Sequence, residues 1–446
     1  MKYKTIELSH TNEIIQTYGV NSLMAKVIES KKIDQEQFKS FMDPHLVYHD
    51  FSLFEEADET LERIEEAIAN KEKICIYGDY DCDGILATTI LVQAFHERGV
   101  EVGYHIPNRF TDGYGLNTTR VEQMAEKGYS LIITVDNGIK AFDAVEKAGE
   151  LGIDVIITDH HAFDGEVPVA YSIIHTKMSP KYPFKEICGG FIAYKLAAAL
   201  LKHHDPYLFT LASITTISDM MPLLDENRSL VRRGLQFMKQ YKYSSLELLK
   251  GSRDYDVTTI GFTIAPRINA FGRLPELVNP VYLVKYFLKE ADPAYLEKIS
   301  NYASKINSKR QSLTTSLYKE AVTDTSSSCL FYGSENMHEG LVGLVAGKYT
   351  REYEQPAFVM HYNPKEEIYK GSARGIDGFN IYNFFTHHED LFVQYGGHAK
   401  AGGFTITKSN YPLVYDALMN DIKGCHFEAS ESVIPITLTE FTCSFW

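Results

Sequence analysis

Three short apolar runs in the first half of the chain each lead directly into acidic residues. The runs are Ile74–Tyr77, Leu131–Val135 and residues 155–158. They are followed in turn by Gly-Asp-Tyr-Asp-Cys-Asp-Gly with Asp79, Asp81 and Asp83, by Asp136-Asn-Gly, and by Asp159-His160-His161. Carboxylates and imidazoles bind divalent cations or transfer protons. A single Asp-x-Asp is often only a turn, and a lone His-His pair is more often structural, so function depends on whether the clusters meet.

The elements around these clusters predict that they do meet. Helical patterns lie between the apolar runs, over about 85–98, from a cap at Asn117 to about 128, and over 140–150, and a strand is expected over 100–106. Short buried strands alternating with helices predict βαβ units and a parallel sheet. The carboxyl ends of parallel strands share one edge, where ligands bind. Five aspartates and two histidines should therefore crowd one crevice.

So much negative charge at close range requires protonation of some carboxylates or bound divalent cations. Mixed aspartate and histidine ligands suit Mn²⁺, Zn²⁺ or Fe better than Ca²⁺, and carboxylates with water also admit Mg²⁺. Two cations roughly 3.5–4 Å apart are the usual device for hydrolysing phosphate esters. The residues alone therefore favour metal-dependent phosphoester hydrolysis.

The segments GDYDCDG, TVDNG, TDHH and ISDMMPL resemble, in this order, the four metal-site motifs of the DHH phosphoesterase superfamily. YHIPNRFTDGYGLN, APRINAFGRL, HEGLVGLVAGK, GSARGIDGFNIYNFF and YGGHAKAGGF further resemble the RecJ family of bacterial single-strand-specific 5′→3′ exonucleases, over about residues 22–422. The resemblance implies an α/β fold of two domains, a parallel-sheet DHH phosphoesterase domain and a smaller α/β DHH-associated C-terminal domain, joined by a long helix. The expected boundaries are 1–290 with an N-terminal helical segment, 291–324 for the helix and linker, 325–425, and a tail over 426–446.

The same resemblance implies a role for each matching residue. The implied metal ligands are Asp79, Asp81, Asp83, Asp136, His160 and Asp219, with Asp136 as the bridge between two cations, Mn²⁺ first and Mg²⁺ as the alternative. Asp219 has no local pattern that would single it out. His161 is expected near the scissile phosphate, and Asp159 is expected to orient a histidine. The implied reaction is attack of metal-activated water on phosphorus, releasing 5′-mononucleotides.

Substrate contacts are implied at three further places. Arg109, Ser372 and Arg374 are expected at the 5′-terminal phosphate or the phosphates beside it. Arg267, Asn269 and Arg273 are expected as further phosphate or catalytic-site contacts, and Gly396, Gly397 and His398 as contacts to a nucleotide or a phosphate. Arg310, on the long helix expected to follow Asp292-Pro293, is the weakest of these candidates, because a surface ion pair is the favoured explanation of this residue taken alone. Phe271 stands where the family usually has a small residue, which alters either base stacking or packing.

Composition narrows the class of protein. The formal net charge of −15 over 446 residues excludes a generally basic coat for nucleic acid, although residues 228–242 form a basic stretch interleaved with aromatic residues. None of the six cysteines forms a Cys-x-x-Cys pair, and the N-terminus has no apolar signal segment, so a cytoplasmic protein without membrane contact is expected.

The expected partner is the 5′ end of single-stranded DNA. RecJ proteins usually continue into an oligonucleotide-binding barrel, and the sequence ends at Trp446 before such a barrel, so weak and salt-sensitive binding is expected, with a helicase or single-strand-binding protein as a further partner. A monomer is the family-level expectation, and both a host and a phage origin remain open. Two alternatives also remain open: a nanoRNase or cyclic-dinucleotide phosphodiesterase, and a non-catalytic nucleic-acid-binding relative.

Overall fold

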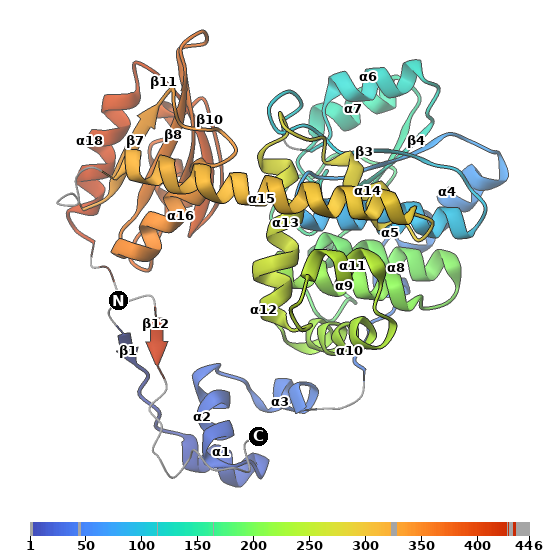
Figure 1. The fold of residues 1–446 in the computed structure, drawn as a ribbon, viewed down its shortest axis with the longest axis horizontal. Coiled ribbons are helices and arrows are strands. Elements are labelled where there is room, and N and C mark those ends of the chain that lie inside the picture. The colour runs from blue at the N-terminus through green and yellow to red at the C-terminus, as the bar shows by residue number, and fades with distance from the viewer. Residues whose placement is uncertain are drawn as a thin grey trace. The chain divides into compact units, whose positions relative to one another are not determined.

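The computed structural model describes residues 3–42, 46–113, 115–163, 165–322, 328–425, 427 and 431–433. The chain divides into two compact units (Figure 1). The larger unit is Lys39–Ser308, and the smaller unit combines Met1–Phe38 with Lys309–Trp446. Each unit has its own sheet, so each is described separately.

A five-stranded sheet forms the first half of the larger unit. Its strand order is β3-β2-β4-β5-β6, and every pair is parallel. The register places Tyr77 beside Thr134 and Val135 beside Thr158, so the strands end at a common edge. The strands are β2 (Ile74–Tyr77), β3 (Gly103–His105), β4 (Leu131–Val135), β5 (Asp154–Thr158) and β6 (Ser172–Ile174).

Both faces of this sheet are covered, which explains the continuous apolar runs. On one face Tyr77, Ile132 and Ile157 share a core with α6 (Thr118–Glu126) and α7 (Phe142–Glu150). On the other face lie α5 (Cys82–Glu97), whose residues 82–95 are all buried, and α8 (Gly189–Leu201). The parallel sheet therefore holds its carboxyl edge in a fixed place between two helical layers.

Further helices complete the larger unit. Helix α9 packs against α5, α8 and α10, and the π-helical turn η3 contacts α9, α11 and α13. The elements are η1 (Phe51–Leu53), α4 (Ala57–Ala69), η2 (Thr176–Met178), α9 (Pro206–Ser218), α10 (Asp225–Tyr241), α11 (Ser244–Lys250), α12 (Val257–Thr259), η3 (Ile260–Ile264), α13 (Ala265–Arg273) and α14 (Val281–Phe287). Helix α3 (Gln35–Met42) includes the division at residue 38.

The long helix expected after Asp292-Pro293 is present as α15 (Pro293–Ala321), with 29 residues. The Asp292 carboxylate accepts the backbone N–H groups of Ala294 and Tyr295, which satisfies donors that have no partner inside the helix. The division between the two units falls within this helix, after Ser308.

The smaller unit contains a mixed sheet of order β10-β11-β9-β8-β7, in which only β7 and β8 are parallel neighbours. A core rich in phenylalanine, including Phe358, Phe385 and Phe404, lies beneath it. The strands and helices are β7 (Leu330–Ser334), α16 (Val342–Tyr353), β8 (Ala357–Asn363), β9 (Ile368–Arg374), α17 (Ile381–His387), η4 (Glu389–Leu391), β10 (Gln394–His398), β11 (Ala401–Thr407) and α18 (Tyr411–Ile422). The same unit includes α1 (Thr11–Tyr18), α2 (Ser22–Ser30) and a parallel pair, β1 (Tyr3–Thr5) with β12 (Glu431–Val433).

The predicted α/β class, with a parallel sheet in one unit and a second sheet in the other, is confirmed, and the largest differences from the expected boundaries are at α5 and β3. The helix expected from 85 begins three residues earlier, because Asp81 accepts the N–H of Gly84 and caps it. The strand expected over 100–106 is only three residues long. The linker over 323–327 and most of the tail lie outside the described residues. Among the helices that the structure describes, none combines the length and apolar character needed to cross a membrane.

Candidate metal centre

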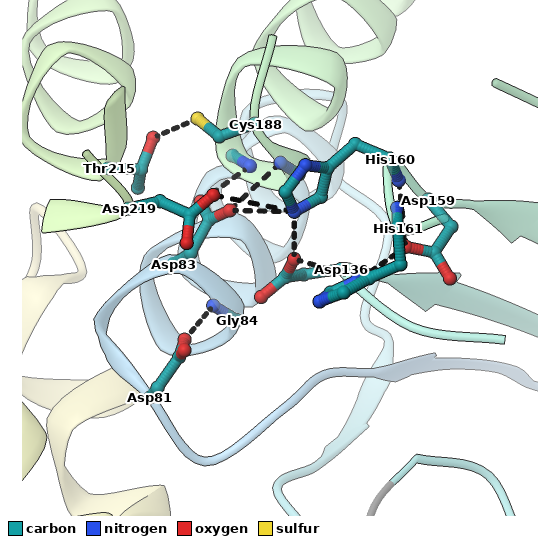
Figure 2. A network of polar contacts seen from close by, with 12 residues as sticks. Asp81, Asp83, Gly84, Asp136, Asp159, His160, His161, Cys188, Thr215 and Asp219 are labelled. Atoms are coloured by element: carbon teal, nitrogen blue, oxygen red, sulfur yellow. Dashed lines mark hydrogen bonds and ion pairs between the residues drawn. The ribbon is translucent and has the colours of Figure 1, made fainter. Parts of the chain in front are cut away.

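The acidic clusters do meet at the carboxyl edge of the parallel sheet (Figure 2). Asp79 and Asp81 follow β2, Asp136 follows β4, and the Asp159-His160-His161 run follows β5. Asp83 lies in the first turn of α5, and Asp219 ends α9 as its C-cap. The strand geometry predicted every one of these positions except that of Asp219, which a helix brings to the site.

The His160 ring lies at the centre of the carboxylates (Figure 2). Its Nε2 is 3.1 Å from Asp136 Oδ1, 3.6 Å from Asp219 Oδ2 and 3.8 Å from Asp83 Oδ2. Asp83, His160 and Asp219 form one group whose ligand atoms lie within 4.8 Å of one another, and Asp79, Asp81 and Asp136 form a second. Asp136 therefore lies beside both groups.

Asp136 is held in an unusual backbone conformation. Its φ of 61° is in the left-handed region, where a residue with a side chain is uncommon and often functional. The side-chain amide of the buried Asn137 donates hydrogen bonds to the carbonyls of Tyr77 and Val135, at 3.2 and 2.9 Å. This amide ties the turn to the ends of β2 and β4, so it fixes where the Asp136 carboxylate points.

The first turn of α8 holds the Asp83 carboxylate. The N–H of Gly189 donates to Asp83 Oδ2 at 2.8 Å, and the N–H of Gly190 donates to Oδ1 at 2.7 Å. Unpaired N–H groups at a helix N-terminus favour a negative charge there. Both positions require glycine, because a Cβ on Gly189 would lie 2.5 Å from the Asp136 Cβ and one on Gly190 would lie 2.5 Å from the Thr215 side chain.

Asp159 orients the two histidines and is fully buried. Its Oδ1 lies 2.8 Å from His161 Nδ1 and accepts the N–H groups of His160 and His161, while Oδ2 accepts the N–H of Ile139. Burial alone would raise the pKa of Asp159, but the charge and hydrogen bond of His161 hold that pKa below its usual range. In return, Asp159 overcomes the effect of burial on His161 and raises the pKa of that ring to about 9.

At the other carboxylates, burial outweighs the hydrogen bonds that favour the charged form, including those from Gly189 and Gly190 to Asp83. Burial, reinforced by neighbouring aspartates, raises the pKa of Asp79 to about 8, that of Asp83 to about 6 and that of Asp219 to about 8. The same two causes raise the pKa of Asp136 well above its usual value. Burial lowers the pKa of His160 to about 3, so this ring is neutral, as a metal ligand must be. One buried oxygen, Asp79 Oδ1, has no hydrogen-bond partner. This donor set fits divalent cations, which would supply the missing positive charge.

Helix α13 is hydrogen-bonded to the loop over 79–82, which carries metal-site residues, and to Arg109. Asn269 Oδ1 accepts the N–H of Cys82 at 2.8 Å, so part of this side chain positions the loop. The Arg109 guanidinium lies 4.1 Å above the Tyr80 ring and donates to the Gly272 carbonyl. A Cβ on Gly272 would lie 2.1 Å from the Tyr80 carbonyl oxygen, so only glycine allows this approach. The remaining two arginines of the segment differ: Arg267 donates to the Leu249 carbonyl, and Arg273 is half-buried at the end of α13.

In the smaller unit the predicted substrate residues lie on adjacent strands. Arg374 donates to Ser372 Oγ at 2.7 Å, beside the first turn of α16, where a Cβ on Gly343 would lie about 3 Å from both side chains. Across the sheet Ser372 pairs with Gly403, which pairs with Gly396. The following residues, Gly397 and the exposed His398, continue β10. Arg310 lies on α15, outside this cluster of strands.

Burial decides between the two interpretations of Phe271 and also defines the role of Cys82. Phe271 has no exposed surface, so the large side chain affects packing and not base stacking. Cys82 is 1% exposed, and burial raises the pKa of its thiol, so it is not a nucleophile. Sequence reasoning missed Gly189 and Gly190; their only local signal is a glycine pair at a helix start.

Family models match both units. The N-terminal domain of the DHH family matches residues 73–218, and the DHHA1 domain matches residues 325–424. A single-stranded-DNA-specific exonuclease RecJ from Bacillus subtilis is 36% identical over 86% of this chain and 50% of its own length. A protein of the same name from Dickeya dadantii is 30% identical over 81% of this chain and 68% of its own length.

A solved structure agrees with this similarity. The crystal structure of Thermus thermophilus RecJ in complex with Mn²⁺ matches 98% of this chain and 65% of its own, with a TM-score of 0.83 and 25% identity. The chain thus spans about half the length of the Bacillus relative and about two thirds of the Thermus chain.

Proposed function

The chain belongs to the RecJ family, and on this premise we propose that it is a metal-dependent exonuclease that hydrolyses single-stranded DNA from the 5′ end to 5′-mononucleotides. The observation that carries the proposal is the group of aspartates around His160, whose ligand atoms gather in two clusters within 4.8 Å at the carboxyl edge of the sheet. A scaffold without catalytic function would gain nothing from this costly arrangement.

The two ligand groups are the proposed sites of two cations. Asp83, His160 and Asp219 would hold one, Asp79, Asp81 and Asp136 would hold the other, and Asp136 would bridge them. Mn²⁺ is the first candidate, because the set mixes imidazole with carboxylate, and Mg²⁺ is the second. Bound cations would supply the Lewis acidity that activates water and offsets charge on phosphoryl oxygens.

The chain's own residues prepare the site for that chemistry. Asp159 fixes the orientation of His161, whose side chain is 37% exposed while Asp159 is buried. His161 is therefore the ring that a phosphate can reach. The N–H groups of Gly189 and Gly190 keep Asp83 ionised and fixed, so the cluster is preorganised before a cation binds.

Each unit offers its own proposed phosphate contacts. In the larger unit this is Arg109, whose guanidinium is already oriented by Tyr80. In the smaller unit they are Ser372 and Arg374, which are hydrogen-bonded to each other. Arg267, Asn269, Arg273, Arg310, Gly396, Gly397 and His398 are retained as proposed contacts. The proposed domain organisation is a catalytic domain over 1–290 and a substrate-binding domain over 325–425, joined by residues 291–324. The protein is also proposed to be monomeric and cytoplasmic, and to work with a helicase or a single-strand-binding protein.

The test uses a 3′-labelled single-stranded DNA bearing a 5′-phosphate, with Mn²⁺ and with EDTA. We expect labelled fragments that shorten progressively from the 5′ end, no cleavage in EDTA, and no cleavage by Asp136→Ala. Phe142→Ala, a half-exposed position on α7, is the control variant and should cleave normally. If the single-stranded DNA were not cleaved while a dinucleotide RNA or a cyclic dinucleotide was hydrolysed, the result would contradict the proposal.

A further inference from the structure

Helix α10 presents a positively charged surface on a protein that is otherwise acidic. Between Glu226 and Glu247 the sequence contains five basic residues and no acidic residue, although the whole chain carries a formal charge of −15. We call the exposed side chains Arg232, Arg233, Lys239, Tyr241 and Lys242, with the partly exposed Phe237 and Tyr243, the α10 surface. Helix α10 packs on α9 through its other side (Figure 1), so this surface faces outward.

Arg232 and Lys239 lie along one side of α10, and Arg233 lies about 100° further round the helix, beside Phe237. Arg232 and Lys239 are seven residues apart, which is close to two full turns, and Lys242 follows directly after the helix end. At about 1.5 Å per residue, the row from Arg232 to Lys242 is about 15 Å long, which is enough for several consecutive phosphates of a strand.

The aromatic residues form a continuous series of ring contacts. Ring centroids are 5.7 Å apart for Phe237 and Tyr241, 5.7 Å for Tyr241 and Tyr243, and 4.7 Å for Tyr243 and Tyr207. The Arg233 guanidinium lies 4.6 Å above the Phe237 ring, and Tyr241 is 47% exposed. Cations beside exposed rings are the combination that binds the phosphates and bases of single strands.

The series of rings ends at a pocket of 270 Å³ lined by Tyr207, Tyr243 and Tyr286 with Pro293 and Leu296. Its polar groups are already engaged. The Tyr207 hydroxyl donates to the Phe287 carbonyl, the Tyr286 hydroxyl donates to the Ser245 carbonyl, and Lys289 is paired with Glu97 and Asp205. Such a pocket suits an uncharged flat ring better than a carboxylate, because a carboxylate would find no uncommitted positive charge there.

We propose that the α10 surface is a second binding site for single-stranded nucleic acid, outside the metal centre. Phosphates lie along Arg232, Lys239 and Lys242, and bases stack on Tyr241 and against the Tyr243 pocket. The inference rests on the proposed function for the identity of the polymer only. An acidic protein segment is the competing occupant. The aromatic series, and a pocket whose Lys289 is already paired with Glu97 and Asp205, favour nucleic acid.

The test measures binding of fluorescent oligothymidylates of 30 and 5 nucleotides to the full chain in EDTA, so that no strand is cut. Arg232→Ala with Lys239→Ala should weaken binding of the 30-mer at least tenfold and reduce the slope of log affinity against log salt by about 1.4, since each phosphate contact on a single strand contributes about 0.7. The charge-matched pair Lys127→Ala with Lys181→Ala, both exposed in the same unit, should change neither.

The aromatic part is tested separately with a conservative rescue. Tyr241→Ala should weaken the 30-mer about fivefold or more, and Tyr241→Phe, which keeps the ring, should bind as the native chain does. The inference would be overturned if the Arg232→Ala/Lys239→Ala and Lys127→Ala/Lys181→Ala variants bound the 30-mer equally well. It would also be overturned if a peptide of aspartate and phenylalanine displaced the 30-mer at a lower concentration than unlabelled DNA does. Hydrolysis of the 5-mer with Mn²⁺ is measured in parallel: its failure would count against the proposed function and not against the α10 surface.

Discussion

Replacing Gly189 by alanine should damage the metal centre without removing any ligand. The added Cβ would lie 2.5 Å from Asp136 Cβ, 2.7 Å from Asp136 Oδ1 and 2.8 Å from Asp136 Cα. Carbon atoms in contact prefer about 3.5–4.0 Å, so one of the two residues must move by about 1 Å. Asp136 has a left-handed backbone tied to β2 and β4 through Asn137, and Gly189 is fixed by its hydrogen bond to Asp83.

Crowding of this kind costs about 1–3 kcal/mol. If the Asp136 side chain moves to relieve it, the cost appears as weaker binding of the cation, about 5- to 150-fold at 1.4 kcal/mol for each factor of ten. If the whole unit relaxes to relieve the crowding, the melting temperature of a unit of this size should fall by about 2–12 °C. We expect most of the cost to appear in cation binding, because the carboxylate is the part with freedom to move.

The assay is calorimetric titration of the metal-free chain with Mn²⁺, together with a thermal melt. Gly149→Ala is the matched control, because Gly149 lies in α7 and its added Cβ would meet no atom within 4 Å. That control should bind Mn²⁺ normally and melt at the same temperature or slightly higher, since alanine favours a helix by up to about 1 kcal/mol. Native Mn²⁺ affinity and stoichiometry in Gly189→Ala would refute the assignment of Asp136 to the cation site.

Three further predictions concern stability, the α13 contact and pH. Lys195→Met leaves the fully buried Glu226, now 2.7 Å from the Lys195 ammonium, without its counter-charge, so the free energy of unfolding in urea should fall by about 3–5 kcal/mol. Adding Glu226→Gln removes the buried charge and keeps an acceptor for the Tyr182 hydroxyl and the His49 N–H, so it should recover most of that loss, and no recovery would contradict the reasoning. Asn269→Ala removes the acceptor of the Cys82 N–H and should lower Mn²⁺ affinity, whereas Asn269→Asp keeps an acceptor and should lower it less; the reverse order in titration calorimetry would count against a positioning role. The raised pKa values of about 6 to 8 at the site mean that the metal-free folded state binds more protons than the unfolded state above about pH 4, so its stability falls as pH rises to about 8. Since metal ligands must be deprotonated, a fixed Mn²⁺ concentration should raise the melting temperature more at pH 8 than at pH 6. An equal or smaller rise at pH 8 would contradict this assignment of the raised pKa values.

Much of the larger unit could be predicted from local patterns. The apolar runs at β2 and β4 coincide with the observed strands at both ends, and Asn117 caps α6 as expected, with its side chain accepting the N–H of Arg120. These features depend on neighbours within a few residues, so sequence alone contains the information. The sequence places the start of α5 three residues too late, because Asp81 lies in an acidic motif that predicts a metal ligand and conceals its second role as the helix N-cap.

Contacts between distant segments could not be predicted in the same way. The bond from Gly190 to Asp83 joins residues 107 positions apart, and the bond from Cys82 to Asn269 spans 187. Neither has a periodic pattern or cap signal around it. Phe271 shows the same limit, because its type allowed either stacking or packing, and only its burial separates the two.

Local patterns and motifs define the parallel strands, the acidic residues at their ends and the family to which the chain belongs. Strand positions follow from short apolar runs, and parallel strands bring their carboxyl ends to one edge. The three-dimensional packing shows that Asp219 reaches the site at the end of α9, that α8 holds Asp83 through its N-terminal N–H groups, and that α13 is hydrogen-bonded to the Asp79–Cys82 loop. These depend on how helices pack, which is fixed by shape and by hydrogen bonds between residues far apart in the chain.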